Sequence, residues 1–184
     1  MVSGPSGSGK TTLLENALMD RKLSKVLVRS VSYTTRPKRS GEVDGKDYFF
    51  ISEDDFRSNR RQKKILEWTR YLDYYYATPR EFVEKVLREK KSIILCLDVK
   101  GAMQVRRIFP LRTILIFVMP PCLDVLESRI SGRSGDILKE ELLSRVKIAK
   151  TELKYARQYD YIIVNEDLKR ASSELKDIIS VYLK

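Results

Sequence analysis

The glycine-rich segment Gly4-Pro-Ser-Gly-Ser-Gly9-Lys10-Thr11 constrains this chain more than any other feature, because it matches the pattern G-x-x-x-x-G-K-[ST] in full. In such a loop the glycines let backbone N–H groups surround phosphate oxygens, and the next helix directs its positive end at them. Apolar residues at helical spacing follow through residue 18, so a flexible Gly/Ser turn is the weaker interpretation. The nucleotide-phosphate candidates are Gly4, Pro5, Ser6, Gly7, Ser8, Gly9, Lys10, Thr11 and Thr12.

Two side chains of this loop have specific expected roles. Lys10 would reach the β- and γ-phosphates of ATP, and the hydroxyl of Thr11 would ligate Mg²⁺ bound with those phosphates. Only residues 1–3 precede the loop, although the pattern calls for a full strand there. Either the first strand is unusually short, or the chain as given starts after the biological beginning of that strand.

Short β-branched runs alternate with helical patterns along the rest of the chain. This alternation predicts an α/β fold with a mainly parallel sheet flanked by helices. The expected strands are 26–31, 92–98, 113–119 and 161–164. The expected helices are 10–20, 79–90, 100–108, 122–130, 140–158 and 168–183.

The distribution of apolar runs along the sequence predicts a single domain with an inserted subdomain and a lid. Residues 1–31 and 92–184 carry the α/β pattern and form the expected core. Between 32 and 91 the parallel-strand pattern is lost, which indicates an inserted subdomain. The polar stretch 131–139 contains Gly132 and Gly135 and separates two helices, so we expect it to form a short lid.

Composition excludes several classes of function. No histidine occurs, which rules out His-based triads, His metal sites and His general bases. The formal net charge of +11 indicates anionic partners without naming one. Cys96 and Cys122 fit neither a disulfide framework nor a metal-ligand spacing. No signal peptide is recognised, and the longest apolar stretch is far below the ~20 residues of a membrane span, so we expect a cytoplasmic protein without a membrane partner.

A second set of motifs lies in the inserted stretch. It contains the segment Ser32-Tyr-Thr-Thr-Arg36-Pro-Lys-Arg39-Ser-Gly41-Glu42. Arg36 and Arg39, with the later Tyr48, could form a phosphate clamp, since guanidinium groups match phosphate oxygens. On spacing alone, a solvated basic loop is the favoured interpretation. Glu67-Trp68, Tyr74-Tyr-Tyr-Ala-Thr78, Asp98-Val-Lys-Gly101 and Ile163-Val-Asn165 follow in order. With the first loop, this series resembles the guanylate kinases, a family of P-loop nucleoside monophosphate kinases, over essentially the whole chain.

The resemblance implies a function and a set of roles. It implies ATP-dependent phosphorylation of GMP to GDP, as part of purine nucleotide metabolism and GMP recycling, with dGMP as a further expected substrate. Guanine would be read by Ser32 and Glu67 with help from Thr78, and Asp98 would contact bound GMP. The GMP phosphate would be held by Arg36, Arg39, Tyr48 and Tyr76. Arg129, Arg133 and Arg145 would close on the ATP phosphates, and Asn165 would lie near adenine.

Simpler readings stand beside several of these roles. Thr78-Pro79-Arg80-Glu81 is also a capping box, so Thr78 could cap a helix. Tyr76 could pack rather than bind, and Glu67 could be an exposed strand residue. The three arginines 129, 133 and 145 could be solvated helix faces. The apolar run that ends in Asp98 is weak evidence by itself, because apolar strands often end in Asp.

The chain also departs from the resembled pattern. Cys96 and Lys100 stand where the family usually has an acid and a glutamine in D-x-D-x-Q-G, and Ala77 replaces a glycine. The lid sequence Gly132-Arg-Ser-Gly135 differs from the family's G-R-G. These changes bear on metal placement, turnover and lid geometry more than on the reaction.

Two rival functions remain from other classes. A non-catalytic interaction module of the same fold would usually have lost the phosphate loop, which this chain retains. Nucleic-acid binding is suggested only by charge, and its one dense basic run, residues 57–64, is better read as a solvated helix end. We therefore expect ATP and GMP as partners and Mg²⁺ as the cofactor, while the oligomeric state stays open.

Overall fold

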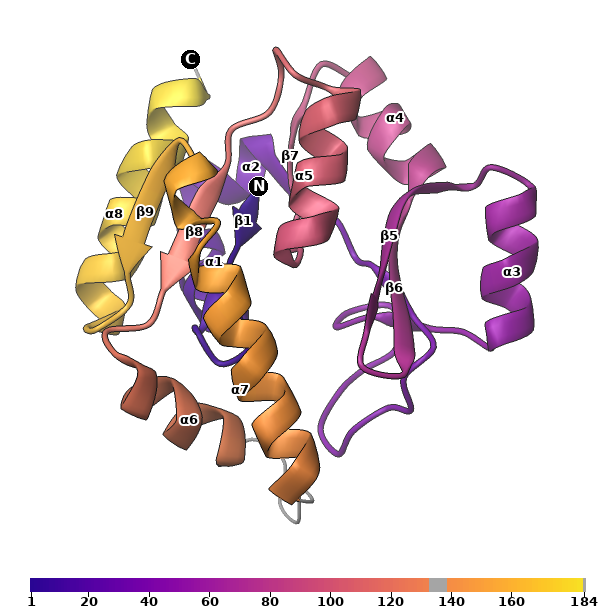
Figure 1. Ribbon diagram of the computed structural model, residues 1–184. Helices are drawn as coiled ribbons and strands as arrows, with labels where there is room; N and C mark the ends of the chain where they lie inside the picture. Colours follow the sequence, from indigo (N-terminus) through magenta and orange to yellow (C-terminus); the bar gives the residue numbers. More distant parts are fainter. Residues whose placement is uncertain (133–138, 184) are drawn as a thin grey trace.

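A computed structural model describes residues 1–132 and 139–183 (Figure 1). Its main sheet is parallel and contains β1 (Val2–Ser3), β8 (Ile116–Met119) and β9 (Tyr161–Val164), with β8 in the middle. A second parallel pair, β2 (Leu27–Arg29) and β7 (Ser92–Ile94), is joined to it through a bridge between Val2 and Cys96. The expected α/β fold with a parallel sheet is confirmed.

Helices cover both faces of this sheet. Each face has its own apolar core, one including Leu13, Leu14 and Leu175, the other including Leu97, Val105 and Phe117. Burial of such faces is the main force that fixes the layers. The core helices are α1 (Lys10–Leu18), α2 (Arg21–Val26), α5 (Val99–Ile108), α6 (Leu123–Ser131), α7 (Lys139–Leu153) and α8 (Leu168–Tyr182), with a short 3-10 helix at Ala156–Gln158.

A separate four-stranded sheet is built from the middle of the chain and stands beside the main sheet (Figure 1). Its spatial order is β4 (Phe49–Phe50), β3 (Tyr33–Thr34), β6 (Tyr74–Pro79), β5 (Ile65–Tyr71). Helices α3 (Glu53–Arg61) and α4 (Arg80–Arg88) flank it. Phe56 of α3 stacks on Tyr75 at 4.3 Å between ring centroids and contacts Trp68 edge-on, so this sheet has an aromatic core of its own. The division into core, insertion and lid stays a prediction.

Several strands and helices are shorter in the structure than the sequence predicted. The strand expected over 92–98 stops at Ile94, because the chain there moves over to pair with Val2 and then turns into α5. The strand expected over 113–119 begins only at Ile116. The helix expected over 140–158 ends at Leu153, and a 3-10 turn follows it.

Two helices were missed by the sequence reading. The expected helix 10–20 ends at Leu18, and Asp20 then accepts the N–H groups of Lys22 and Leu23 to begin α2. Helix α3 begins with a capping box between Ser52 and Asp55, a local pattern that the sequence itself carries.

Three smaller expectations can be compared with the described residues. β1 is only two residues long, which agrees with both interpretations of the N-terminal segment. Cys96 and Cys122 are free thiols. Over 1–132 and 139–183, no helix combines the length and apolar character needed to cross a bilayer. Residues 133–138 of the expected lid lie outside the described residues.

Candidate active site

A cleft of about 420 Å³ lies between the phosphate loop and the second sheet. It collects residues from widely separated parts of the chain, as expected for a site assembled at the carboxyl ends of parallel strands. Thirteen predicted residues line it: Gly4, Ser6, Lys10, Thr11, Thr12, Ser32, Arg36, Arg39, Tyr48, Glu67, Tyr76, Asp98 and Arg145. The predicted residues that lie in the described part without lining the cleft are Pro5, Gly7, Ser8, Gly9, Thr78, Arg129 and Asn165.

The phosphate loop is fixed by contacts at both of its ends. Lys10 Nζ donates to the carbonyl oxygens of Gly4 and Pro5 at 2.7 and 2.8 Å. On the other side, the buried Asn165 donates its amide to the carbonyl oxygen of Ser8 at 2.8 Å. Gly9 has φ 90°, and a Cβ there would lie 2.3 Å from Asn165 Nδ2, so only glycine permits this approach. Asn165 thus braces the loop, a contact that the sequence reading did not foresee.

The predicted phosphate clamp forms a compact group of cations and phenols. Arg36 is 7% exposed and donates to Glu42 Oε1 at 2.7 Å, while the backbone N–H of Arg39 donates to Glu42 Oε2 at 2.8 Å. The rings of Tyr48 and Tyr76 meet edge-on at 5.8 Å, and Arg36 lies 5.6 Å from the Tyr48 ring. Burial raises the pKa of Tyr48, so its hydroxyl stays protonated and can donate a hydrogen bond.

Glu67 is a buried acid, and the reading of it as an exposed strand residue is wrong. Its side chain on β5 is 4% exposed, and the hydroxyl of Thr78 donates to Glu67 Oε1 at 2.6 Å. A Cβ at position 101 would lie 2.6 Å from Glu67 Oε2, so Gly101 leaves room for this carboxylate. Burial raises the pKa of Glu67 to about 7, with a further increase from Asp98 and an opposing effect of Thr78.

Thr78 does not act as a helix cap. Helix α4 begins after Pro79, and no side chain caps its first N–H groups. The hydroxyl of Thr78 points instead to Glu67 on the neighbouring strand, which pairs with residue 78 in the sheet. Thr78 therefore forms a tertiary hydrogen bond with a buried carboxylate in place of a local capping bond, since hydrogen bonds to charged acceptors are the stronger ones.

Both carboxylate oxygens of Asp98 are already engaged by the protein. Oδ1 accepts the backbone N–H of Gly101 at 2.7 Å and so caps α5, and Oδ2 accepts the hydroxyl of Thr69 at 2.6 Å. Asp98 lines the cleft, and it also has a structural role, because its carboxylate caps the first turn of α5.

The three predicted ATP-side arginines differ in their placement. Arg145 on α7 lines the cleft and is paired with Glu141 at 2.6 Å. Arg129 on α6 donates to the carbonyl oxygen of Asn165 at 3.3 and 3.2 Å, behind the loop. Arg133 lies outside the described residues.

Sequence reasoning missed several residues of the cleft. Ser30 lies two positions before Ser32, so an extended chain directs both side chains to one side. Glu152 lies seven positions after Arg145, two helical turns along the same face of α7. Spacing could have found these two, whereas the rest depend on tertiary structure. The missed lining residues are Arg29, Ser30, Glu42, Asp47, Thr69, Tyr71, Ala77, Cys96, Leu97 and Glu152.

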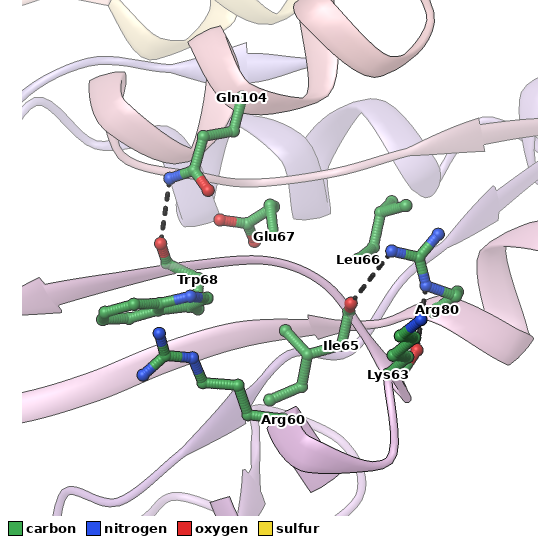
Figure 2. Close-up of a pocket in the computed structure, with 8 residues that line it drawn as sticks. All are labelled: Arg60, Lys63, Ile65, Leu66, Glu67, Trp68, Arg80 and Gln104. Atoms are coloured by element: carbon green, nitrogen blue, oxygen red, sulfur yellow. Dashed lines mark hydrogen bonds between the residues drawn. The ribbon is translucent and has the colours of Figure 1, made fainter. Parts of the chain in front are cut away.

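A second cavity, of about 550 Å³, also borders β5 and shares Glu67 with the cleft (Figure 2). Arg60 lies 4.5 Å from the centre of the Trp68 ring, and Gln104 donates to the Trp68 carbonyl oxygen at 2.9 Å. Arg80 donates to the carbonyl oxygens of Lys63 and Ile65. These contacts fix the strand that carries Glu67, and α3 ends within the basic run 57–64.

The raised pKa of Glu67 predicts a pH-dependent cost in stability. A carboxyl whose pKa rises on folding stabilises the fold below its unfolded pKa near 4.5, and this contribution is lost as the pH rises through about 7. Glu67→Gln, which stays neutral, should raise the melting temperature at pH 8 by several degrees, for up to about 3 kcal/mol of relieved burial cost. At pH 5 the two proteins should melt together.

Thermal unfolding followed by circular dichroism at both pH values measures this effect. Glu174→Gln, on an exposed position of α8, serves as the charge-matched control. A Glu67→Gln difference that is equal at pH 5 and pH 8 would show that the charge of the buried carboxylate is not its cause.

Comparison with known proteins gives a consistent family assignment. A family model described as Guanylate kinase matches residues 1–182. The chain is 42% identical over 179 residues to a guanylate kinase of Caldanaerobacter subterraneus subsp. tengcongensis, covering 97% of this chain and 84% of the relative. It is 40% identical over 179 residues to a guanylate kinase of Desulfitobacterium hafniense, covering 97% and 87%.

Solved structures agree with this result. A crystal structure of guanylate kinase from Anaplasma phagocytophilum superimposes with a TM-score of 0.79 at 30% identity, covering 99% of this chain and 84% of that one. A shikimate kinase from Bacteroides thetaiotaomicron, with a TM-score of 0.50 at 17% identity and coverage of 97% and 96%, shares the fold alone.

Proposed function

Because this chain belongs to the guanylate kinase family, we propose that it transfers the γ-phosphoryl group of ATP to GMP, giving ADP and GDP. One observation supports the acceptor more than any other. The cleft that begins at the phosphate loop also contains Glu67, a buried acid. Its Oε1 accepts from Thr78, and its Oε2 lies in the space that Gly101 leaves free.

Guanine recognition would rest on Glu67. A carboxylate accepts hydrogen bonds only, and guanine offers the N1–H and N2–H₂ donors that adenine lacks on that edge. Thr78 holds one carboxylate oxygen, and Ser32 lines the same cleft. AMP would bury the carboxylate without supplying the N–H donors of guanine and so incur a desolvation penalty, which rejects the wrong base.

The phosphate of GMP would bind to Arg36 and Arg39, with the hydroxyls of Tyr48 and Tyr76 as further donors. Glu42 orients this group before substrate arrives, since it contacts Arg36 through its side chain and Arg39 through the backbone. Such preorganisation lowers the entropic cost of fixing the acceptor. Because the clamp would contact the phosphate and not the base, it would serve any nucleoside monophosphate.

On the ATP side, Lys10 and the backbone of the loop would hold the phosphates, and Arg145 would add a charge from α7. The oxygen-rich donor set suits Mg²⁺: Thr11 lines the cleft with its hydroxyl, and hard oxygen ligands are what this ion prefers. Guanylate kinases generally use Mg²⁺ with ATP. When bound, the ion would neutralise negative charge on the phosphates.

Catalysis by this chain would consist of positioning and charge stabilisation. Phosphoryl transfer requires little covalent chemistry from the protein, so the absence of histidine is no obstacle. The clamp would place the GMP phosphate, and Lys10 and Arg145 would stabilise the charge that develops on the transferred group. The adenine contact proposed for Asn165 would be combined with its bracing of the loop.

The test is ADP formation from Mg-ATP with a panel of GMP, dGMP, AMP, UMP and CMP as acceptors. We expect GMP to have the highest kcat/KM, with AMP lower by at least two orders of magnitude. A preference for AMP or UMP, or equal use of all acceptors, would refute the proposed function.

A further inference from the structure

Glu152 is a buried acid of the cleft for which the fold provides no complete set of partners. Its side chain lies on α7 and is 9% exposed. Oε2 of Glu152 is buried and has no hydrogen-bond partner in the part of the chain that the structure describes. A buried carboxylate oxygen without a donor is costly, so its retention here points to a group that arrives with the substrate.

The neighbours of Glu152 show which end of the cleft it faces. Lys10, Asp98 and Lys100 are the charged groups that act on it, and a backbone hydrogen bond comes from Val99 at the start of α5. Ser6 and Thr11 of the phosphate loop line the same cleft. The orphaned oxygen therefore lies where the ATP phosphates, with their accompanying cation, would be placed, rather than at the guanine end.

Two other acids of the cleft have partners for both of their carboxylate oxygens. Glu42 pairs with Arg36 and the N–H of Arg39, and Asp98 accepts from Gly101 and Thr69. Glu67 faces the position assigned to guanine. Among the described residues Glu152 is thus the acid best placed to receive donors from the metal–phosphate end.

We propose that Glu152 accepts hydrogen bonds from water molecules bound to the Mg²⁺ of Mg-ATP, and so forms part of the outer coordination shell of the metal. Mg²⁺ keeps several waters when it binds through few protein oxygens and phosphates. In the described residues no group of three or more acidic or cysteine side chains could hold a metal by itself, so the ion would be bound mainly through the nucleotide and water. The inference rests on the proposed use of Mg-ATP.

This role has a signature that a purely structural role lacks. Without Mg²⁺ the carboxylate of Glu152 repels the triphosphate, and with Mg²⁺ it stabilises the complex. Glu152→Gln should therefore strengthen binding of the metal-free nucleotide and weaken binding of its magnesium complex. A residue that only supports α7 would change both affinities by the same factor.

Isothermal titration calorimetry with a non-hydrolysable ATP analogue, with EDTA or with excess Mg²⁺, measures both affinities. We divide the dissociation constant of the metal-free analogue by that of its magnesium complex. This ratio should be about tenfold lower in Glu152→Gln than in the parent protein. Glu152→Asp keeps the charge but moves it back by one methylene group, so it should give an intermediate ratio. If the glutamine variant does not fold, the ratio measured for Glu152→Asp is the test of the proposal. Glu140→Gln, exposed on the same helix, should match the parent protein.

The possible failures can be told apart. An unchanged ratio in both variants at position 152, with normal binding of the analogue, overturns the role of Glu152 and leaves the proposed function intact. Absence of any analogue binding by the parent protein overturns both.

Discussion

Replacing Lys10 with methionine is expected to lower kcat by about two to three orders of magnitude while changing KM for GMP by less than about threefold. Lys10 begins α1, directly after the phosphate loop, and its Nζ reaches the carbonyl oxygens of Gly4 and Pro5. Methionine keeps most of the apolar stem and removes the charge. The loss should fall on the transfer step because the cation stabilises charge that develops on the transferred group.

Steady-state kinetics at saturating Mg-ATP, with each substrate varied in turn, separate the two effects. Lys22→Met, on α2 and exposed, is the matched control because it makes the same chemical change outside the cleft. Circular dichroism should show the same fold for both variants. A kcat within tenfold of the parent value, or an equal increase in KM for both nucleotides, would contradict the assigned role of Lys10.

Apart from the missed helix α2, the sequence predicted the loop and the order of the core strands and helices correctly, because both depend on local patterns. The motif at Gly4–Thr11 fixes a loop followed by a helix, and β9 occupies the expected positions 161–164. Strand ends were less predictable. The apolar residues after Ile94 predict that the strand continues, but in the structure β7 ends there and Cys96 pairs with Val2 of β1.

The site shows a similar division between local and tertiary information. Residues carried by a motif, such as Arg36 and Tyr48, were found and do line the cleft. Thr78 was open to two readings, and only the sheet register that places it opposite Glu67 decides between them. Glu152 was missed because its helix carries an ordinary mixed pattern, and nothing local shows that one acid of α7 is buried.

Guanine recognition and phosphate recognition should be separable, because different residues carry them. Arg36 belongs to the clamp, and its guanidinium group donates to the Pro37 carbonyl oxygen and to Glu42 rather than to Glu67. Arg36→Ala should raise KM for GMP and AMP by similar factors and leave their ratio within about threefold. This variant is therefore the natural comparison for a change at Glu67.

Glu67→Gln is expected to lower kcat/KM for GMP by about 10- to 100-fold and to leave that for AMP equal or higher. This range corresponds to loss of a hydrogen bond to a charged acceptor, worth about 1.5–3 kcal/mol. The amide NH₂ of glutamine can donate to adenine N1, an acceptor that repels the carboxylate. The ratio of GMP to AMP use is the measurement, and an unchanged ratio would remove Glu67 from base recognition.

The pH profile of the same pair of proteins tests the state of the carboxyl group. With a pKa of about 7, Glu67 is largely protonated at pH 6 and ionised at pH 8, so KM for GMP should be about tenfold lower at the higher pH. A phosphate monoester itself titrates near pH 6 and contributes to this change. In Glu67→Gln the KM for GMP still changes with the titration of the phosphate but no longer with that of the carboxyl group. The difference between the pH profiles of the parent protein and this variant therefore gives the contribution of Glu67. The ionised carboxylate of Glu67 would then have two effects above pH 7. It would destabilise the protein without substrate, and it would make guanine the preferred base, because only the ionised, desolvated carboxylate requires the N–H donors of guanine.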